Sequence, residues 1–412
     1  MRSEWRLSTI NEICSLVTDG AHNSPKSVIN GAYMASVKDF TEYGLDFSSC
    51  RMISEEDYEK LRLQGCVPEF NDILVGKDGA RYFEDIIIYK QPEKPALLSS
   101  IAILRTDRKK VIPEFLYYTL KSPSVRKVVR DNYGSGSAIP RIVLKDFKRM
   151  PIAFPPIDEQ KKLVSIFVSI DEQIQNNNKI NNNLEQQALA LFRHYFMDYE
   201  PYGGSAPSSW TAVSLDDVCV RITDGSHYSP ADDPNAPYPM YSVKDMETYG
   251  FNSSSCKHIT EEEFHRMQKN DCVPRFNDIL VAKDGSYLKE IFICSEERDE
   301  AILSSIAIFR PDTEIIIPEI LLYLLKQPSV RKDVGDNYVS GSALPRIVLK
   351  DFKKYSFLLP PMTEQSKIGS VLHSIRMQTK ANIDEVQRLS ALRDALLPRL
   401  MSGELDVSDI EL

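Results

Sequence analysis

The sequence lacks the features of several classes of protein. No stretch in its 412 residues approaches the run of about 18 apolar residues that a membrane-spanning helix needs. The first ten residues also lack the apolar core of a secretion signal. We therefore expect a cytoplasmic protein with no membrane partner.

Cysteine is scarce, and its count of seven is odd. Six cysteines occupy matching positions of a repeat described below, and Cys294 stands alone. No pair has the Cys-x-x-Cys spacing typical of a zinc site. The sequence predicts small, buried, reduced thiols, with disulfides or a metal site as the alternative.

Catalytic motifs are also missing. The sequence contains no Walker-type phosphate loop, no dinucleotide fingerprint, no His-Glu-x-x-His and no Gly-x-Ser-x-Gly. Of six histidines, only His22 and His227 fall at similar places in the two halves. The carboxylates and lysine that a nuclease needs do not occur at a suitable spacing. We therefore predict that the chain is not an enzyme by itself, with no catalytic residue, metal or cofactor of its own.

Positive charge is not in excess. The 50 Lys and Arg residues against 59 Asp and Glu residues give a net charge of −9 at pH 7, whereas a protein that coats DNA alone is usually basic. Part of the acidity is local, because residues 403–412 carry acidic residues and no basic ones, while basic residues gather in 141–149. The net charge of the whole chain therefore excludes little.

A repeat extends over nearly the whole length. Residues 131–148 return almost unchanged at 336–353, which is 205 positions later, and Trp5 and Trp210 have the same offset. Solenoid repeats are only about 20 to 50 residues long. The repeat is therefore a duplicated module of domain size, and each copy is long enough to bury its own core.

Each module begins with short apolar runs that are separated by Gly, Asp and Asn turns. These runs predict strands at 72–75, 85–89 and 97–104. Helices are predicted to begin at Pro113 and Pro123, because proline is favoured at the first helical position. We expect each module to be α/β, with mixed helix and strand.

A heptad pattern follows each module. Apolar residues step alternately by four and three positions over about 40 residues, or roughly 60 Å of helix. Because each long apolar stripe needs a partner, we expect the two helices to pack on each other as an antiparallel coiled coil. The predicted positions of this seam are Leu163, Phe167, Ile170, Ile174, Asn177, Asn181, Leu184, Ala188, Leu191 and Tyr195, then Ile368, Leu372, Ile375, Thr379, Asn382, Val386, Leu389, Arg393, Leu396 and Leu400.

Asn177 and Asn382 occupy the same seam position in the two copies. A polar residue at such a position lowers stability but fixes the register of a coiled coil. Ordinary variation along the seam is the alternative interpretation.

The predicted organisation is a dumbbell with an approximate two-fold axis, in which two similar globular modules are joined by two long helices. Its segments are a first module at 1–155, a long helix at 156–198, a Gly, Ser and Pro linker at 199–209, a second module at 210–360, a second long helix at 361–402 and an acidic tail at 403–412.

The order of these parts resembles a known family. A Pro-Pro-x-x-Glu-Gln motif at 155–160 recurs at 360–365, and the second helix ends in Leu-Pro-Arg-Leu-Met-Ser-Gly-Glu at 397–404. With the two modules and the two helices, these motifs resemble the specificity (S) subunit of Type I restriction-modification enzymes from end to end.

The resemblance implies that the modules are target-recognition domains, each of which reads one half of an interrupted sequence in double-stranded DNA. It implies that the helices set the spacing and dock two methyltransferase (M) subunits, which restriction (R) subunits join for cleavage. The S subunit of the family has no catalytic residues. S-adenosylmethionine, ATP and magnesium belong to the partner subunits.

Polar loop residues that recur in both modules are the candidate DNA contacts. Gly permits close approach of the backbone, Ser donates to phosphate, and Lys, Asp and His can contact base edges; the alternative is that Asp-Gly strings are only turns. The candidates are Thr18, Asp19, Gly20, His22, Lys38, Lys77, Asp78, Tyr82, Tyr133, Ser135, Ser137 and Arg141, and in the second module Thr223, Asp224, Gly225, His227, Lys244, Lys283, Asp284, Tyr287, Tyr338, Ser340, Ser342 and Arg346. For the tyrosines and arginines, a packing role is the alternative.

The sequence departs from the family in one respect. In the family the helices usually match better between the halves than the modules do, whereas here the modules match closely. We therefore predict similar half-sites on opposite strands, which form a nearly palindromic, interrupted target with about 10 base pairs between the half-site centres.

Two other functions stay open. The chain can serve a methyltransferase that has no nuclease partner, or it can be a two-domain scaffold that binds proteins and not DNA. The scaffold predicts no salt-dependent binding to duplex DNA.

Overall fold

The computed structural model describes residues 5–79, 81–134, 140–341, 343–405 and 407. The chain forms two compact units, and each is assembled from two parts of the sequence. Unit 1 contains Met1–Gln175 and Val386–Leu412, and unit 2 contains Asn176–Glu385. Both long helices therefore contribute to both units.

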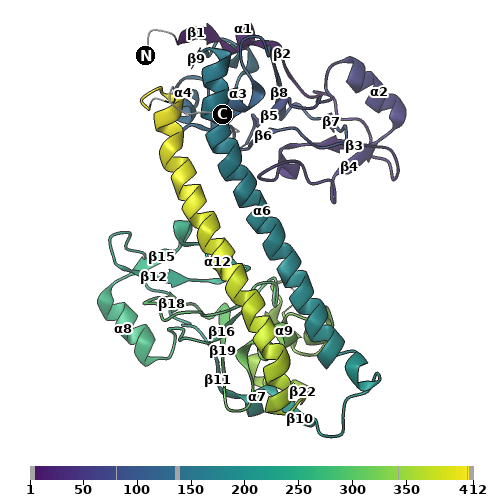
Figure 1. The fold of residues 1–412 in the computed structure, drawn as a ribbon, viewed down its shortest axis with the longest axis vertical. Coiled ribbons are helices and arrows are strands. Elements are labelled where there is room, and N and C mark those ends of the chain that lie inside the picture. Colours follow the sequence, from purple (N-terminus) through teal and green to yellow (C-terminus); the bar gives the residue numbers. More distant parts are fainter. Residues whose placement is uncertain (1–4, 80, 135–139, 342, 406, 408–412) are drawn as a thin grey trace. The chain divides into compact units, whose positions relative to one another are not determined.

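Unit 1 is built on a four-stranded antiparallel sheet with the strand order β2-β8-β5-β6 (Figure 1). A three-stranded sheet, β4-β3-β7, lies beside helix α2, and β1 pairs with β9. The strands are β1 (Arg6–Thr9), β2 (Cys14–Asp19), β3 (Ala32–Ala35), β4 (Arg51–Ile53), β5 (Ile73–Gly76), β6 (Ile86–Ile88), β7 (Ala96–Leu97), β8 (Ile101–Thr106) and β9 (Pro151–Phe154).

Helices α3 and α4 of unit 1 begin where the sequence predicts them. Proline occupies the first turn of both α3 and α4, and the Ser122 hydroxyl accepts a hydrogen bond from the Val125 N–H at the start of α4. The helices are α1 (Ile10–Ile13), α2 (Glu55–Leu63), α3 (Pro113–Lys121), α4 (Pro123–Asn132), α5 (Leu144–Phe147), the 3-10 helix η1 (Val37–Asp39) and the first part of α6 (Ile157–Phe196), which continues into unit 2.

Unit 2 repeats this architecture with the sheets β11-β19-β16-β17, β15-β12-β18 and β10-β22. Its strands are β10 (Thr211–Ser214), β11 (Cys219–Asp224), β12 (Tyr238–Tyr241), β13 (Met246–Glu247), β14 (Gly250–Phe251), β15 (Lys257–Ile259), β16 (Ile279–Ala282), β17 (Ile291–Ile293), β18 (Ala301–Ile302), β19 (Ile306–Pro311), β20 (Val339–Ser340), β21 (Arg346–Ile347) and β22 (Ser356–Leu359). Its helices are α7 (Leu215–Val218), α8 (Glu261–Lys269), α9 (Pro318–Leu325), α10 (Pro328–Asn337), α11 (Leu349–Phe352), the 3-10 helices η2 (Glu200–Tyr202), η3 (Val243–Asp245) and η4 (Ser253–Ser255), and the first part of α12 (Met362–Met401), which continues into unit 1.

The single strand predicted at 97–104 is wrong. The chain turns between β7 and β8, and a hydrogen bond from the Ile101 N–H to the Leu98 carbonyl closes the turn at 3.0 Å. β7 pairs with β3 in one sheet, whereas β8 lies in the four-stranded sheet. The apolar run continues through the turn because both strands are buried, so its length could not reveal the break.

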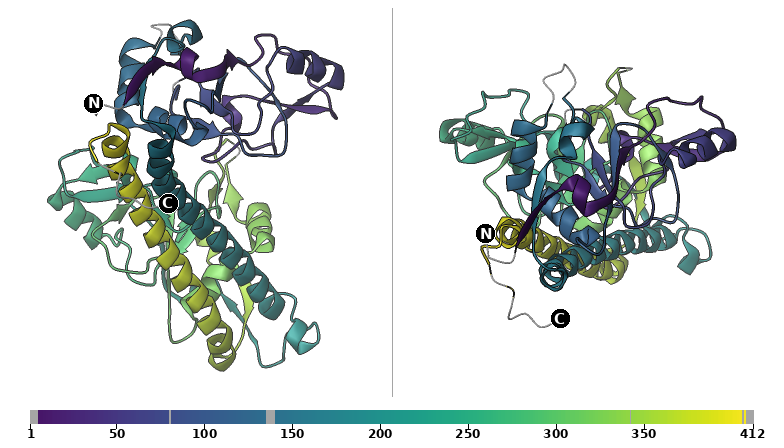
Figure 2. Two further views of the ribbon diagram at one scale, coloured as in Figure 1. Left: turned by 45° about the horizontal axis from the view of Figure 1, so that its top comes forward. Right: turned by 90° about the horizontal axis from the view of Figure 1, so that it is seen from above.

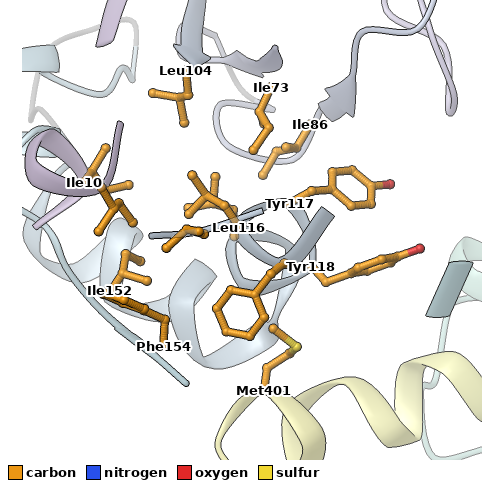
Figure 3. Packing of buried hydrophobic residues seen from close by; sticks show 14 of the residues in the cluster. Ile10, Ile73, Ile86, Leu104, Leu116, Tyr117, Tyr118, Ile152, Phe154 and Met401 are labelled. Atoms are coloured by element: carbon orange, nitrogen blue, oxygen red, sulfur yellow. The ribbon is translucent and has the colours of Figure 1, made fainter. Parts of the chain in front are cut away.

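The core of unit 1 lies between the four-stranded sheet, α3 and the long helices. Figure 3 shows side chains from the sheet and from α3 packed around Leu116, with Met401 of α12 at the edge of the cluster. Burial of each large apolar side chain stabilises the fold by about 1.5 to 3 kcal/mol. The hydroxyls of Tyr117 and Tyr118 point out of this cluster (Figure 3).

The glutamine of the Pro-Pro-x-x-Glu-Gln motif fixes the start of each long helix. Gln160 is fully buried. Its side chain accepts a hydrogen bond from the Ile112 N–H at 3.0 Å and donates to the Lys110 and Pro155 carbonyls at 2.9 and 2.8 Å. Gln365 makes the same three bonds at the start of α12. The motif therefore joins each long helix to the loop before α3 or α9.

The glutamate of the motif binds the tryptophan of its own module. The Trp5 indole donates to Glu159 Oε1 at 3.2 Å, and the Trp210 indole donates to Glu364 Oε2 at 3.1 Å. Both indoles are buried. The two tryptophans therefore tie the beginning of each module to the helix that follows it in the sequence.

The long helices are antiparallel in both units and lie side by side in Figure 1 and in the left view of Figure 2. In unit 1, Ile170 and Ile174 of α6 pack with Leu389 of α12. In unit 2, Asn181 of α6 contacts Asn382 of α12. The prediction of mixed α/β modules with antiparallel long helices is confirmed.

The predicted seam fails near the end of α6. Phe192 and Phe196 are buried there, whereas Leu191 and Tyr195 are only partly buried. An α-helix with 3.6 residues per turn drifts away from a strict heptad, and this end of α6 packs into the core of unit 2. The core of the unit, and not the partner helix alone, selects the buried face.

Asn382 does not contact Asn177, the asparagine at the matching position of the repeat. Asn382 Nδ2 donates to Asn181 Oδ1 at 2.8 Å, and both side chains are buried, whereas Asn177 is half-buried. In an antiparallel pair, equivalent positions of a repeat face each other only at the centre of symmetry, so Asn177 is not the partner of Asn382. The role of Asn177 and Asn382 in fixing the register stays a prediction.

All seven cysteines lie within the described residues and are free thiols, of which five are buried as predicted and two, Cys50 and Cys219, are half-buried. Of the helices that are described, none combines the length and the apolar character that crossing a membrane requires.

Candidate nucleic-acid interface

Two strand ends meet at one edge of the four-stranded sheet of unit 1. β2 and β5 flank β8, and both are antiparallel to it, so they run in the same direction and end at the same edge. Asp19 is the last residue of β2, and Lys77 follows β5. Lys77 Nζ lies 3.1 Å from Asp19 Oδ2, and the lysine is only 8% exposed. The fold thus forms a buried ion pair between residues 58 positions apart in the chain.

Unit 2 contains the same ion pair. Asp224 ends β11, Lys283 follows β16, and Lys283 Nζ is bonded to Asp224 Oδ2. Lys283 is only 5% exposed. In both units, the lysine that the sequence predicts as a DNA contact forms an ion pair with a carboxylate of the same unit.

A histidine contacts the aspartate of each ion pair. His22 Nε2 lies 3.3 Å from Asp19 Oδ1, and His227 Nε2 lies 3.3 Å from Asp224 Oδ2. Their side chains are 74% and 76% exposed. The aspartate holds one ring nitrogen, so the rest of the imidazole faces solvent and can bind phosphate or a base edge.

The string that matches best between the copies lies against this site. Asp78 forms an isolated antiparallel bridge with Arg141, and the Ile142 N–H donates to the Lys77 carbonyl at 2.8 Å. In unit 2, Asp284 forms the same bridge with Arg346. Arg141 and Arg346 are exposed beside their ion pairs.

The side chain of Arg346 is paired with a carboxylate. Arg346 Nε lies 3.0 Å from Asp284 Oδ1, and its side chain stays 53% exposed. Such a pair holds the start of the guanidinium and leaves donors for a bidentate contact with phosphate or guanine.

Gly20 and Gly225 are required by close packing. A Cβ on Gly20 would lie 2.2 Å from the Leu97 carbonyl oxygen, and one on Gly225 would lie 2.3 Å from that of Ile302. Only glycine allows the chain to pass here after the Asp. Thr18 and Thr223 support the same turn, since each hydroxyl donates to the carbonyl of the following aspartate at 3.4 Å.

Lys38 and Lys244 lie exposed on the 3-10 helices η1 and η3. η3 is attached to the ion-pair loop of unit 2, because the Val243 N–H donates to Ser305 Oγ and the Ser305 carbonyl accepts from the Lys283 N–H, each at 3.0 Å. Lys244 is 65% exposed at the side chain. These lysines therefore add exposed positive charge close to the strand ends.

The predicted tyrosines lie in packing contacts. A Cβ on Gly134 would lie 2.8 Å from the Tyr82 hydroxyl, and one on Gly335 would lie 2.5 Å from that of Tyr287. Tyr133 and Tyr338 pack against the cores of their units. Their part in DNA binding stays a prediction.

Of the predicted serines, Ser340 lies exposed on β20, which pairs with β21 next to Arg346. Ser135, Ser137 and Ser342 lie outside the described residues.

Sequence reasoning missed a pair of cations that hold the loop after Asp19 and Asp224. Arg51 donates to Ser24 Oγ at 2.6 Å and to the Pro25 carbonyl at 3.2 Å. Lys257 donates in the same way to the matching serine and proline of unit 2, at 2.7 and 3.2 Å. The signal was present, because the Ser-Pro pair recurs in the repeat with a cation at both matching positions.

The thiols beside the site, Cys66 and Cys272, are not activated as nucleophiles. Burial, together with the charges of Asp224 and Asp271, raises the pKa of the Cys272 thiol to about 11. Burial and Asp19 also raise the pKa of Cys66. Thiols of this kind are protonated at neutral pH and unreactive.

No cluster of three or more His, Cys, Asp or Glu side chains in the described part of the chain is placed to hold a metal ion. The arrangement instead presents exposed histidine, arginine and lysine side chains over a buried ion pair, at one sheet edge in each unit. Such donors suit the phosphates and base edges of a nucleic acid.

Comparison with known proteins shows the family of the chain. A family model described as the Type I restriction modification DNA specificity domain matches residues 2–186 and again residues 207–388. The specificity subunit of the Type I restriction enzyme MjaIX from Methanocaldococcus jannaschii is 26% identical over 317 residues, which cover 73% of this chain and 71% of the relative. The HindI specificity subunit from Haemophilus influenzae is 22% identical over 359 residues, covering 72% and 78%.

A solved structure has the same fold. The S subunit of the Type I restriction-modification system from M. genitalium matches with a TM-score of 0.55 at 14% identity, over 97% of both chains. The family model covers both modules. The chain therefore belongs to the Type I restriction-modification DNA specificity family, and it contains two copies of the specificity domain.

Proposed function

We propose that this chain selects the DNA sequence for a Type I restriction-modification complex, and that each unit binds one half of a bipartite site in double-stranded DNA. One observation carries the proposal. The same exposed histidine and arginine stand over the same buried Asp-Lys pair at the same sheet edge in both units.

The chemistry of the complex belongs to other subunits in this proposal. Two methyltransferase subunits use S-adenosylmethionine, and the restriction subunits use ATP and magnesium. The names of the relatives, which are specificity subunits of Type I restriction enzymes, support this division. The chain itself contributes sequence recognition and a docking surface.

The long helices have the role of a spacer in this proposal. α6 and α12 each contain 40 residues, a length of roughly 60 Å at 1.5 Å per residue. Because each helix contributes residues to both units, the helix length is the proposed determinant of the half-site spacing. The expected separation of the half-site centres is about one turn of duplex DNA, or about 10 base pairs.

The two half-sites are similar in this proposal. The side chains at the strand ends are the same in both units at Asp19 and Asp224, His22 and His227, and Arg141 and Arg346. Equal side chains on equal frames favour equal bases. We therefore propose an interrupted target that is nearly palindromic.

The test is to express this chain with its cognate methyltransferase subunit in a host that lacks adenine methylation, and to map methylated adenines by single-molecule sequencing. The expected result is an interrupted motif with two similar halves. His22→Ala should weaken selection in one half and His227→Ala in the other.

A matched control for these variants is Arg62→Ala, which removes an exposed cation that pairs with Glu59 on α2. It should leave the motif unchanged. If a folded and stoichiometric complex neither methylates DNA nor binds duplex DNA in a salt-dependent way, the proposal is wrong and the chain is better explained as a protein scaffold.

A further inference from the structure

The loop after the Asp-Gly turn is held at the same two points in both units. It begins at the ion pair of Asp19 or Asp224 and is fixed again at Ser24 or Ser229 by a cation, Arg51 or Lys257. The residues between these points can therefore be compared directly, because the frame around them is the same.

Two residues within this frame differ. Unit 1 has Ala21 and Asn23, whereas unit 2 has Ser226 and Tyr228. The Ser226 hydroxyl accepts a hydrogen bond from the Tyr228 N–H at 3.1 Å and donates to the Tyr228 carbonyl at 2.7 Å. Ala21, at the matching position of unit 1, has no hydroxyl to make these bonds. The two hydrogen bonds that hold the backbone of Tyr228 are therefore specific to unit 2.

The Tyr228 side chain is also held from outside the loop. The guanidinium of Arg266 lies 4.7 Å from the centre of its ring, and its hydroxyl lies 3.5 Å from Glu263 Oε1. Both partners lie on α8. A cation over an aromatic ring is attracted to the ring face, so this contact favours one orientation of the Tyr228 side chain.

The matching helix of unit 1 has no equivalent arrangement. The position of Arg266 is occupied by Lys60 in α2, and Lys60 Nζ pairs with Glu56 of its own helix at 2.7 Å. At the positions of Tyr228 and Arg266, unit 1 has Asn23 and Lys60. Neither the aromatic ring nor the guanidinium is therefore present at these positions.

Tyr228 is nonetheless 48% exposed and directly follows the exposed His227. A rigid aromatic ring that faces solvent beside a DNA-contacting residue offers an apolar surface with little loss of conformational entropy on binding. In the major groove the apolar feature of the base edges is the C5-methyl group of thymine.

We propose that Tyr228 is a specificity-determining residue of the second recognition domain, and that it contacts a thymine methyl at a base pair that the first domain does not select. The inference rests on the proposed function. The two half-sites then share the bases selected through the common histidine and arginine, and the half bound by unit 2 has one additional fixed T·A pair.

The experiment uses the full chain with its cognate methyltransferase subunit and maps methylated adenines for wild type, Tyr228→Asn and Tyr228→Phe. Tyr228→Asn should lower the preference for T·A at one position of one half-site by about tenfold, which is the discrimination of a single base contact. The other half should not change. Tyr228→Phe keeps the ring and should keep the preference.

Two further variants separate recognition from support. Ser226→Ala releases the backbone of Tyr228 and should lower the same preference by a smaller factor. Phe276→Ala removes another exposed aromatic side chain, 55% exposed and located before β16, at the end opposite Lys283. It should leave both half-sites unchanged.

The outcomes distinguish the inference from the function on which it rests. If wild type gives an interrupted motif and Tyr228→Asn leaves both halves unchanged, the inference is wrong and the proposed function stands. The inference is also wrong if Tyr228→Asn lowers methylation equally at all sites, because the ring then serves stability alone. If folded wild type gives no methylation, the proposed function fails first.

Discussion

Asn382 and Asn181 form a buried hydrogen bond between α12 and α6, in which the Nδ2 of Asn382 donates to the Oδ1 of Asn181 at 2.8 Å. Gln378 donates to the Oδ1 of Asn382 at 2.9 Å. A buried amide is costly unless its hydrogen bonds are made. We therefore expect the pair to favour the alignment of the helices in which these hydrogen bonds are made.

Replacing one asparagine of this pair should cost more than replacing both. Asn382→Leu leaves the buried Asn181 amide without this partner, and we expect it to lower the free energy of unfolding by about 1 to 3 kcal/mol. The double variant Asn181→Leu/Asn382→Leu should recover most of this loss. Urea unfolding of the three proteins measures the difference, and a single variant more stable than wild type would contradict the prediction.

The buried ion pair between Arg393 and Asp171 joins the long helices in unit 1. Arg393 Nη1 donates to Asp171 Oδ1 at 2.9 Å, and the Tyr118 hydroxyl donates to Asp171 Oδ2 at 2.6 Å. Burial, followed by the charge and hydrogen bond of Asp171, raises the pKa of Tyr118. The tyrosine thus stays a donor at all ordinary pH values.

Removing the arginine alone should be strongly destabilising. Arg393→Leu leaves Asp171 buried with one fewer donor, and we expect a loss of about 3 kcal/mol or more in the free energy of unfolding. Asp171→Leu/Arg393→Leu removes both charges and should be much closer to wild type. Additive effects of the two single changes would show that the charges do not interact.

The motif glutamines should be more important than their exposed neighbours. Gln160→Leu or Gln365→Leu removes three hydrogen bonds to backbone groups, of which one comes from the N–H of Ile112 or of Ile317, respectively. We expect a loss of about 2 to 4 kcal/mol for each. Lys161→Ala, which breaks an exposed pair with Asp158, should change stability by less than about 0.5 kcal/mol. Equal effects of Gln160→Leu and Lys161→Ala on thermal unfolding would be evidence against the role of the motif.

The glycines after the strand-end aspartates should not tolerate alanine. The added Cβ would meet a backbone oxygen at 2.2 Å at Gly20 and at 2.3 Å at Gly225, so the loop must move. We expect a loss of more than about 3 kcal/mol for each. A Cβ on Gly250 meets nothing within 4 Å among the described residues, so Gly250→Ala serves as the control and should stay within about 0.5 kcal/mol of wild type.

Glu300 should make stability depend on pH. Burial raises its pKa above the ordinary value of 4.5, although Arg298 opposes the shift. An acid with a raised folded-state pKa stabilises the fold when protonated, and this contribution is lost as the pH rises from 4.5 through the folded-state value.

Glu300→Gln cannot become charged, so the variant should be more stable than wild type at pH 7, and the difference should shrink as the pH falls through the folded-state pKa of Glu300 toward 4.5. Unfolding of both proteins by urea between pH 4 and pH 8 measures it. A difference that stays constant over this range would show that the glutamate has no net effect through its charge.

The fold was predictable wherever local signals and burial agree. Pro113 and Pro123 begin helices because their fixed backbone angle suits a first turn. The break between two strands within residues 97–104 could not be predicted from the sequence, because the residues on both sides of the turn are buried and apolar. The end of the α6 seam was mistaken for the same reason, since Phe192 and Leu191 are equally apolar and only the core of unit 2 selects Phe192.

At the candidate site, the repeat identified the polar residues, but it did not show which of them are buried and which are exposed. Lys77 and Arg141 look alike in sequence as exposed cations. The strand order places Lys77 on Asp19, where it is buried, and leaves Arg141 in solvent. Tyr228 gave no signal, because a feature present in only one copy cannot be found by searching for recurrence.

The sequence by itself determined the duplication, the mixed α/β modules, the two long helices and the family, because each depends on periodicity or on a motif within a short stretch. Only the tertiary structure decided which polar residues meet, because the partners are distant in the chain. Asp19 with Lys77, Asp171 with Arg393 and Asn181 with Asn382 are brought together by strand order and by the antiparallel helices. Hydrogen bonds and ion pairs act only at contact distance, so their identity depends on the packing of the apolar core that sets those distances.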